Sequence, residues 1–233
     1  ASFCKMSLSF HVNPSYARID EVLPGLFISG VSALNLATME AHKITYIINA
    51  TNEVPNLRSL SHIQRTKLWL DDTPQTYIYP HLELQADQMA TLLEDGQRVL
   101  VHCVAGVSRS ASLVLAYLTK YRCRSLRAAY HVLKKSRPLV RPNLGFWRQL
   151  ITFEQNVKGV PPSVRLVRDN AQTESEQLLP DVYLADAIAA SSSSSSSECP
   201  SSGIDELRER RPSSGDRPKF RPVLATLAEI EAA

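Results

Sequence analysis

Short apolar runs and longer amphipathic segments alternate along the first 160 residues of the chain. Runs rich in β-branched and aromatic residues, bounded by turn residues, predict strands. Four such runs occur, and they are GLFISG (25–30), KITYIINAT (43–51), TKLWL (66–70) and VLVHC (99–103). The last run has almost no polar alternation, which is typical of a strand buried on both faces of a sheet.

Segments with apolar residues at helical spacing predict helices. They cover residues 80–95, 110–121, 125–137 and a stretch that starts near Asn143. The second segment is apolar nearly all round, so we expect it in the interior, whereas the third starts at Ser125, a common N-cap residue, and ends before Pro138. The order of elements predicts an α/β fold with a central mixed, largely parallel sheet of four to five strands flanked by helices.

The composition changes near Gly159, where apolar periodicity gives way to Pro, Ser and charged residues. A run of serines at 191–197 cannot bury enough apolar area to order itself. We therefore expect an N-terminal extension (1–16), a folded domain (17–160) and a Ser/Pro-rich, largely disordered tail (161–233). A tail that carries phosphorylation sites or binds a partner is the alternative to a plain flexible tail. Within it, LLPDVYLADAIAA (178–190) is expected either to dock on the domain or to form a short helix.

The net charge is only +3, but between Asp95 and Glu154 there are eleven Lys and Arg residues and no carboxylate. Such a positive lobe attracts anionic ligands, although a solvated basic helix face is the alternative. The four cysteines are scattered, which favours a reducing compartment, so we expect the cytoplasm or nucleus. The N-terminus lacks the pattern of a secretory signal, and a mitochondrial targeting signal is left as an alternative. No apolar run is long enough to span a bilayer.

The stretch VLVHCVAGVSRSASLVLAYL places a thiol and a guanidinium inside an otherwise apolar segment. A strand ends near His102 and a helix begins near Ser110, so backbone N–H groups of the turn between them can converge on one anion. Gly106 allows the tight curl, and Arg109 can grip two oxygens of a phosphate. The same positive field favours the thiolate form of Cys103, which makes the sulfur a nucleophile.

The predicted phosphate-binding residues of this turn are Val104, Ala105, Gly106, Val107, Ser108 and Arg109. Ser110 is placed to donate a hydrogen bond to the sulfur when it becomes the leaving group, and we expect His102 to order the loop rather than act as a base. A buried structural thiol is the alternative for Cys103. The arginine six residues later and the flanking strand and helix favour the catalytic interpretation.

HCVAGVSRSASLVLAYL resembles the signature of the cysteine-dependent protein phosphatases, and specifically of the small atypical dual-specificity phosphatases that lack a kinase-docking domain. IDEVLPGLFISG, ITYIINAT and RPNLGFWRQLITFE are similar to other segments of that family, so the resemblance covers about residues 17–158. It implies a cysteine-phosphatase-like fold and hydrolysis of phosphotyrosine and phosphoserine or phosphothreonine on proteins through a phosphocysteine intermediate. It implies no metal and no cofactor.

The family mechanism also needs a general acid on a separate loop after a strand. The resemblance places that acid at Asp72 in DDTP, with Asp71 as the fallback and a solvated turn as the alternative. Asn143 matches a family position that braces the phosphate loop, and it is equally suited to cap a helix. The catalytic set expected from the resemblance is therefore Cys103, Arg109 and Asp72.

Phosphorylated proteins, signalling kinases among them, are the expected partners, with no nucleic acid and no membrane insertion; the oligomeric state is left open. The absence of lysines between Cys103 and Arg109 disfavours a phosphoinositide substrate. A non-catalytic phosphoprotein-binding module is the main rival, although the thiol, the arginine and the acid are all present. An RNA 5′-phosphatase is the third hypothesis, and the chain lacks the aromatic-interleaved basic stripe that supports base stacking.

Overall fold

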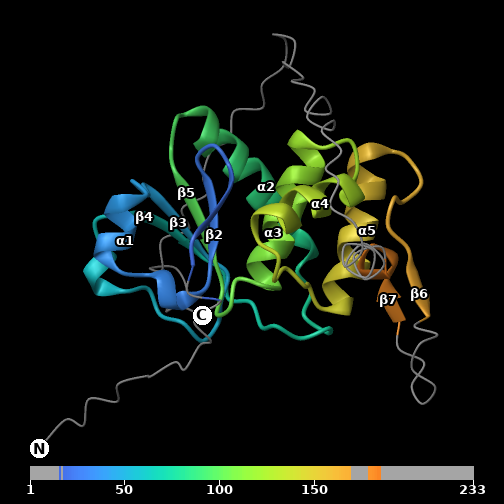
Figure 1. Cartoon of the computed structure of the whole chain (residues 1–233), viewed down its shortest axis with the longest axis horizontal. Helices are drawn as coiled ribbons and strands as arrows, with labels where there is room; N and C mark the ends of the chain where they lie inside the picture. Colours follow the sequence, from blue (N-terminus) through green and yellow to red (C-terminus); the bar gives the residue numbers. More distant parts are fainter. Residues whose placement is uncertain (1–15, 17, 169–177, 185–233) are drawn as a thin grey trace, which may run out of the picture.

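The computed structural model describes Tyr16, residues 18–168 and residues 178–184. Its central sheet has five strands in the order β1-β2-β5-β3-β4, and only the β1–β2 pair is antiparallel (Figure 1). The strands are β1 (Asp20–Leu23), β2 (Leu26–Ser29), β3 (Tyr46–Asn49), β4 (Gln64–Lys67) and β5 (Val99–His102). This mixed, mostly parallel sheet confirms the predicted fold class.

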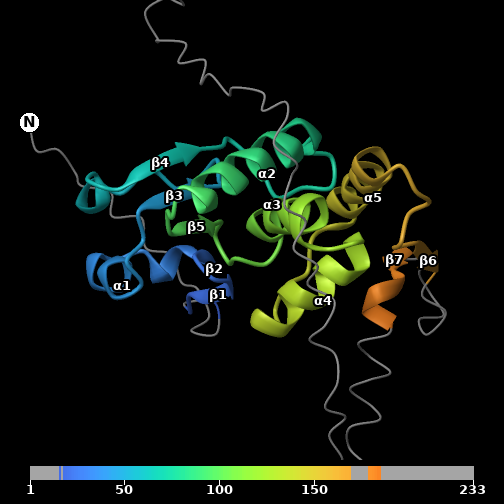
Figure 2. The same cartoon turned by 90° about the horizontal axis from the view of Figure 1, so that it is seen from above.

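Both faces of the sheet are buried, and they are covered unequally. The larger core lies between the sheet and α2–α5 and includes Ile28, Ile48 and Val101. The neighbouring residues Phe27, Ile47 and Leu100 point to the opposite face, where they pack against Met39 of α1 (Leu36–Ala41). Figure 2 shows α1 and α2–α5 on opposite sides of the sheet. Successive side chains of a strand alternate between faces, so two buried faces explain the continuous apolar run of β5.

The helices of the larger layer match the predicted segments closely. They are α2 (Tyr79–Glu94), α3 (Arg109–Tyr117), α4 (Leu126–Ser136) and α5 (Leu144–Lys158). Ser125 caps α4 by accepting a hydrogen bond from the Ala128 N–H (3.2 Å). Every residue of α3 is buried, as its apolar sequence predicts.

Several elements differ from the prediction. The edge strand β4 covers Gln64–Lys67 instead of the predicted run 66–70, because its neighbour β3, with which it pairs in parallel, ends at Asn49. Strand β1, helix α1 and the 3-10 turns at Val31–Ala33 and Arg58–Leu60 were not predicted. The buried helix changes after Tyr117 into a π-helical turn (Leu118–Arg122), which brings Lys120 and Tyr121 to the Asp87 carboxylate of α2 (2.7 and 2.6 Å).

Part of the segment assigned to the tail packs on the domain. Strands β6 (Leu166–Arg168) and β7 (Leu178–Pro180) form an antiparallel pair, and Val164 and Val182 are fully buried in the larger core. The packed unit thus extends past the expected boundary at residue 160, because these apolar side chains fill space beside α4 and α5. Residues 1–15, 169–177 and 185–233, which hold most of the predicted extension and tail, lie outside the described residues.

None of the helices in the described ranges is both long and apolar enough to cross a membrane.

Candidate active site

The phosphate loop, residues 103–109, joins the end of β5 to the start of α3. β5 is the central strand and lies between β2 and β3, so the loop leaves the sheet at the carboxyl edge of three parallel strands. Functional sites of open α/β sheets form at this edge. Helix α3 begins at Arg109 and directs its N-terminus, which carries a partial positive charge, at the loop.

The carbonyl oxygens of the phosphate loop are all bound from outside the loop. Val104 accepts from the Val31 N–H (2.9 Å) and Val107 from the Arg141 N–H (2.9 Å). Arg137 donates to the oxygens of Ala105 (2.9 Å) and Gly106 (2.7 Å). Within the described part of the chain, the N–H groups of residues 104, 105, 107 and 108 have no acceptor. These donors are therefore available to an anion, as in other anion-binding loops before helices.

The Cys103 sulfur lies at the bottom of this loop and is 1% exposed. It accepts hydrogen bonds from the Gly106 N–H (3.1 Å) and from the Ser110 hydroxyl (3.2 Å). Gly106 has a φ of 69°, and a Cβ there would stand 2.5 Å from the Ser29 backbone. The loop thus needs glycine at this position, for conformation and for space.

Arg109 is held by the loop that follows β3. Its Nη1 and Nη2 atoms donate to the two oxygens of Glu53 (both 2.7 Å), and Nη1 also donates to the Leu70 carbonyl (3.0 Å). Burial has the largest effect and opposes the charge, but the hydrogen bonds to Glu53 and the negative charges of Cys103, Glu53 and Asp72 together outweigh it and raise the pKa of Arg109. The same hydrogen bond lowers the pKa of Glu53.

The contacts of Arg109 leave one edge of its guanidinium open. Of the five N–H donors of an arginine, three are taken by Glu53 and Leu70. The remaining two are the Nε–H and one Nη2–H, which lie on the same edge. The Nε atom is buried and has no hydrogen-bond partner within the described residues. This edge is suited to bind two oxygens of one phosphate.

Asp72, the predicted acid, lies in the segment after β4 and close to Arg109. Its Oδ1 accepts hydrogen bonds from the Ser108 hydroxyl (2.7 Å) and the Asn143 side-chain amide (2.9 Å). Its Oδ2 is 3.6 Å from the Arg109 Nε. The neighbouring Asp71 turns away and accepts a hydrogen bond from Asn52 (3.1 Å).

Asn143 does two things at once. Its Oδ1 caps α5 by accepting from the Phe146 N–H (3.0 Å), while its amide nitrogen donates to Asp72. Its backbone N–H donates to the Ser108 hydroxyl (3.1 Å). Asn143 therefore contacts the phosphate loop through its backbone and the acid loop through its side chain.

His102 is 2% exposed, and its Nδ1 lies 3.3 Å from the Cys103 carbonyl oxygen. Burial lowers the pKa of His102 to about 4. The ring is therefore neutral near pH 7, which agrees with a role in ordering the loop.

Glu53 and Arg137 were missed in the sequence. Arg137 is 1% exposed and pairs with Asp20 of β1 (2.6 Å) in addition to its bonds to the phosphate loop. Lys67 donates to the Val54 carbonyl (2.6 Å) and so holds the loop that carries Glu53. Glu53 follows a parallel strand whose end meets that of β5 at the same edge, and this topology is the signal that could have pointed to it.

Comparison with known proteins places this geometry in a family. The sequence profile described as "Dual specificity phosphatase, catalytic domain" matches residues 26–156. Dual specificity protein phosphatase 14 of Mus musculus is 38% identical over 169 residues, which cover 70% of this chain and 85% of the mouse protein. Dual specificity protein phosphatase 21 of Homo sapiens is 42% identical over 142 residues, which cover 60% of this chain and 74% of the human protein.

Solved structures agree with this similarity. A mouse protein described as a dual specificity phosphatase, in complex with zinc tungstate, superposes with a TM-score of 0.57 at 32% identity, over 66% of this chain and 95% of that chain. The structure of human DUSP28 superposes with the same TM-score at 28% identity, over 63% and 97% of the two chains.

Proposed function

Because this chain belongs to the dual specificity phosphatases and is a protein phosphatase, we propose that the phosphate loop is its catalytic centre and that Cys103 is the nucleophile. The substrates are proteins that carry phosphotyrosine, phosphoserine or phosphothreonine. The observation that supports this most is the loop's arrangement. The loop carbonyls are bound from outside the loop, the N–H groups of residues 104, 105, 107 and 108 have no acceptor among the described residues, and the open edge of Arg109 borders the same space.

In the first step the Cys103 thiolate attacks phosphorus, and the sulfur–phosphorus bond forms as the bond to the leaving oxygen breaks. The open edge of Arg109 and the loop N–H groups bind the other phosphate oxygens, where charge accumulates in the transition state. Asp72 protonates the leaving oxygen. Its Oδ2 is the atom that would carry this proton, because Oδ1 accepts two hydrogen bonds.

In the second step water attacks the phosphocysteine. The Asp72 carboxylate takes a proton from this water, and the sulfur leaves as a thiolate. The Ser110 hydroxyl, 3.2 Å from the sulfur, donates a hydrogen bond that stabilises the leaving thiolate. Each residue thereby returns to its starting protonation state.

A related mouse protein was solved in complex with an oxyanion, which supports anion binding by this chain. Tungstate is tetrahedral and anionic like phosphate, and that protein was solved with zinc tungstate. We propose that this chain binds such anions on the loop N–H groups and the open edge of Arg109.

Hydrolysis of p-nitrophenyl phosphate by the wild type and by Cys103→Ser tests the proposal. The serine variant loses all turnover because its hydroxyl is not ionised at neutral pH, while tungstate still protects it from thermal unfolding. Cys123→Ser is the matched control, since that buried thiol lies outside the phosphate loop. Equal turnover by Cys103→Ser and the wild type would refute the mechanism. A wild type without turnover that still binds tungstate would support the binding-module alternative.

A further inference from the structure

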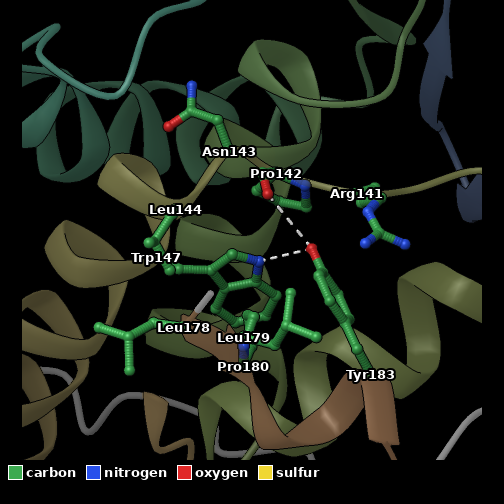
Figure 3. A pocket seen from close by; sticks show the side chains of 9 residues that line it. All are labelled: Arg141, Pro142, Asn143, Leu144, Trp147, Leu178, Leu179, Pro180 and Tyr183. Carbon is green, nitrogen blue, oxygen red and sulfur yellow. Dashed lines mark hydrogen bonds between the residues drawn. The ribbon is translucent and has the colours of Figure 1, made fainter. Parts of the chain in front are cut away.

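A pocket of about 200 Å³ lies beside the active site, between the start of α5 and the segment 178–183. Its walls are mostly apolar and include Leu144, Trp147, Leu178 and Leu179. Figure 3 shows these side chains around the pocket, with Arg141 and Tyr183 on one side. Drug-sized ligands occupy pockets of roughly 300–1,000 Å³, so a pocket of this size fits a single side chain.

The far wall of the pocket is fixed by hydrogen bonds. The Tyr183 hydroxyl accepts from the Trp147 indole N–H (2.6 Å) and donates to the Pro142 carbonyl (3.2 Å) (Figure 3). Next to it, Asp181 pairs with Arg127 of α4 (2.6 Å). The pocket is therefore formed before any ligand arrives, which lowers the entropy cost of binding.

The pocket and the phosphate loop share one segment of chain. The Arg141 N–H donates to the Val107 carbonyl of the loop (2.9 Å), and Asn143, which also lines the pocket, holds Asp72. A peptide whose phosphorylated residue occupies the loop would therefore place a residue a few positions away at this pocket.

The charge around the pocket favours a peptide with an acidic residue near the apolar one. The Arg141 side chain lines the pocket, with its guanidinium 4.9 Å from the centre of the Tyr183 ring. Within the described residues Arg141 has no carboxylate partner, and no acidic residue lines the pocket. The site thus combines apolar walls with one unpaired positive charge at its edge, so an acidic residue beside an apolar one would complement it.

We propose that this pocket is a specificity subsite that binds a bulky apolar side chain of the phosphoprotein substrate, and that Arg141 pairs with a carboxylate next to that side chain. This inference rests on the proposed function, because it assumes that the phosphorylated residue lies in the phosphate loop.

A set of phosphotyrosine peptides tests the subsite on the full chain. In a Gly/Ser background, leucine is moved through the four positions on either side of the phosphotyrosine, and aspartate is then added next to the best leucine. We expect one leucine position to raise kcat/KM by about tenfold, as burial of most of a leucine side chain predicts. The aspartate adds about twofold more, and salt weakens this second gain.

Two variants with matched controls assign these gains to the pocket. Leu179→Glu removes the leucine gain, whereas Leu184→Glu keeps it, because Leu184 is exposed and does not line the pocket. Arg141→Gln removes only the aspartate gain, whereas Arg148→Gln, on the exposed side of α5, keeps it. In every variant the peptide values are divided by kcat/KM for p-nitrophenyl phosphate, which reports on the catalytic centre alone.

Binding of the same peptides to Cys103→Ser, measured by calorimetry, separates the subsite from catalysis. If the wild type has no turnover, the proposed function is refuted. The subsite is then still tested by whether the position of leucine in the peptide changes the binding affinity of Cys103→Ser. The subsite is refuted if no leucine position helps, or if Leu179→Glu and Leu184→Glu behave alike. An increase in turnover of the leucine peptide by Leu179→Glu would also refute it, because an apolar pocket wall would then not favour the leucine side chain.

Discussion

Glu53 binds Arg109 end-on, with both carboxylate oxygens 2.7 Å from the two terminal guanidinium nitrogens. The Arg109 side chain is 5% exposed and the Glu53 side chain 43% exposed, so the pair lies at the boundary between core and solvent. This contact fixes the plane of the guanidinium. The Glu53 contact leaves the Nε edge of the guanidinium open for the proposed phosphate. Glu53 therefore acts through Arg109 and does not itself bind the phosphate.

Replacement of Glu53 by glutamine should misorient Arg109 without removing it. We expect kcat/KM for p-nitrophenyl phosphate to fall by about 10- to 100-fold, because a small displacement of a clamp residue has effects of this size. Steady-state kinetics measure the effect. Glu83→Gln is the control, since Glu83 pairs with Lys120 on the exposed surface of α2. Equal rates for the two variants would show that Arg109 does not depend on Glu53.

Replacement of Arg137 by methionine should destabilise the protein, because the buried Arg137 guanidinium donates hydrogen bonds to two carbonyls of the phosphate loop. The change leaves the buried Asp20 carboxylate with only the exposed Arg18 as its cation, and it removes the donors of the Ala105 and Gly106 carbonyls. We expect the free energy of unfolding to fall by about 3–5 kcal/mol, as for other broken buried pairs. Urea denaturation measures it.

A second substitution separates charge from loop support in this prediction. Asp20→Asn in the Arg137→Met background should restore part of the stability, because the buried carboxylate that lost its buried cation is then neutral. It should not restore turnover, since the loop carbonyls still lack their donors. Arg148→Met, at an exposed position on α5, should leave both quantities near the wild-type values. Full stability in Arg137→Met alone would contradict the role given to this arginine.

The sequence analysis predicted the site residues that lie close together in the sequence, and it missed those whose partners lie far away in the sequence. The thiol, glycine and arginine of the phosphate loop lie within seven residues and follow a strand whose apolar run is unmistakable. Glu53 and Arg137 look like ordinary surface residues, because their partners are 56 and 117 residues away in the chain. β1 was missed for the same reason, since DEVL gains its strand character only by pairing with β2.

The two adjacent aspartates should differ sharply in their effect on turnover. Asp72→Asn removes the proton donor, and we expect kcat on a phosphoserine peptide to fall by about 10²- to 10⁴-fold. The loss should be smaller with p-nitrophenyl phosphate, whose leaving group needs no proton. Asp71→Asn is the matched control, because Asp71 binds Asn52 instead of facing the phosphate loop. Similar losses in both variants, or the larger loss in Asp71→Asn, would contradict the assignment of the acid.

His102 should make the protein less stable in mild acid. Burial lowers its pKa from 6.5 to about 4, so between these values the unfolded chain binds a proton that the folded chain does not. Stability therefore rises with pH across this window, and acidification from pH 7 to 4 should cost about 3 kcal/mol from this residue alone. His81, whose pKa burial also lowers, acts in the same direction.

Urea denaturation at pH 7 and pH 4.5 checks this pH dependence in the wild type and in His102→Gln. The variant has no ring to protonate, so its loss of stability on acidification should be smaller than that of the wild type. His62→Gln serves as the control, because His62 is exposed and its substitution should leave the difference between the two pH values unchanged. If His102→Gln loses as much stability as the wild type, then the buried ring is not what opposes protonation, and carboxylates such as Glu53, whose pKa Arg109 lowers, must carry the acid sensitivity instead.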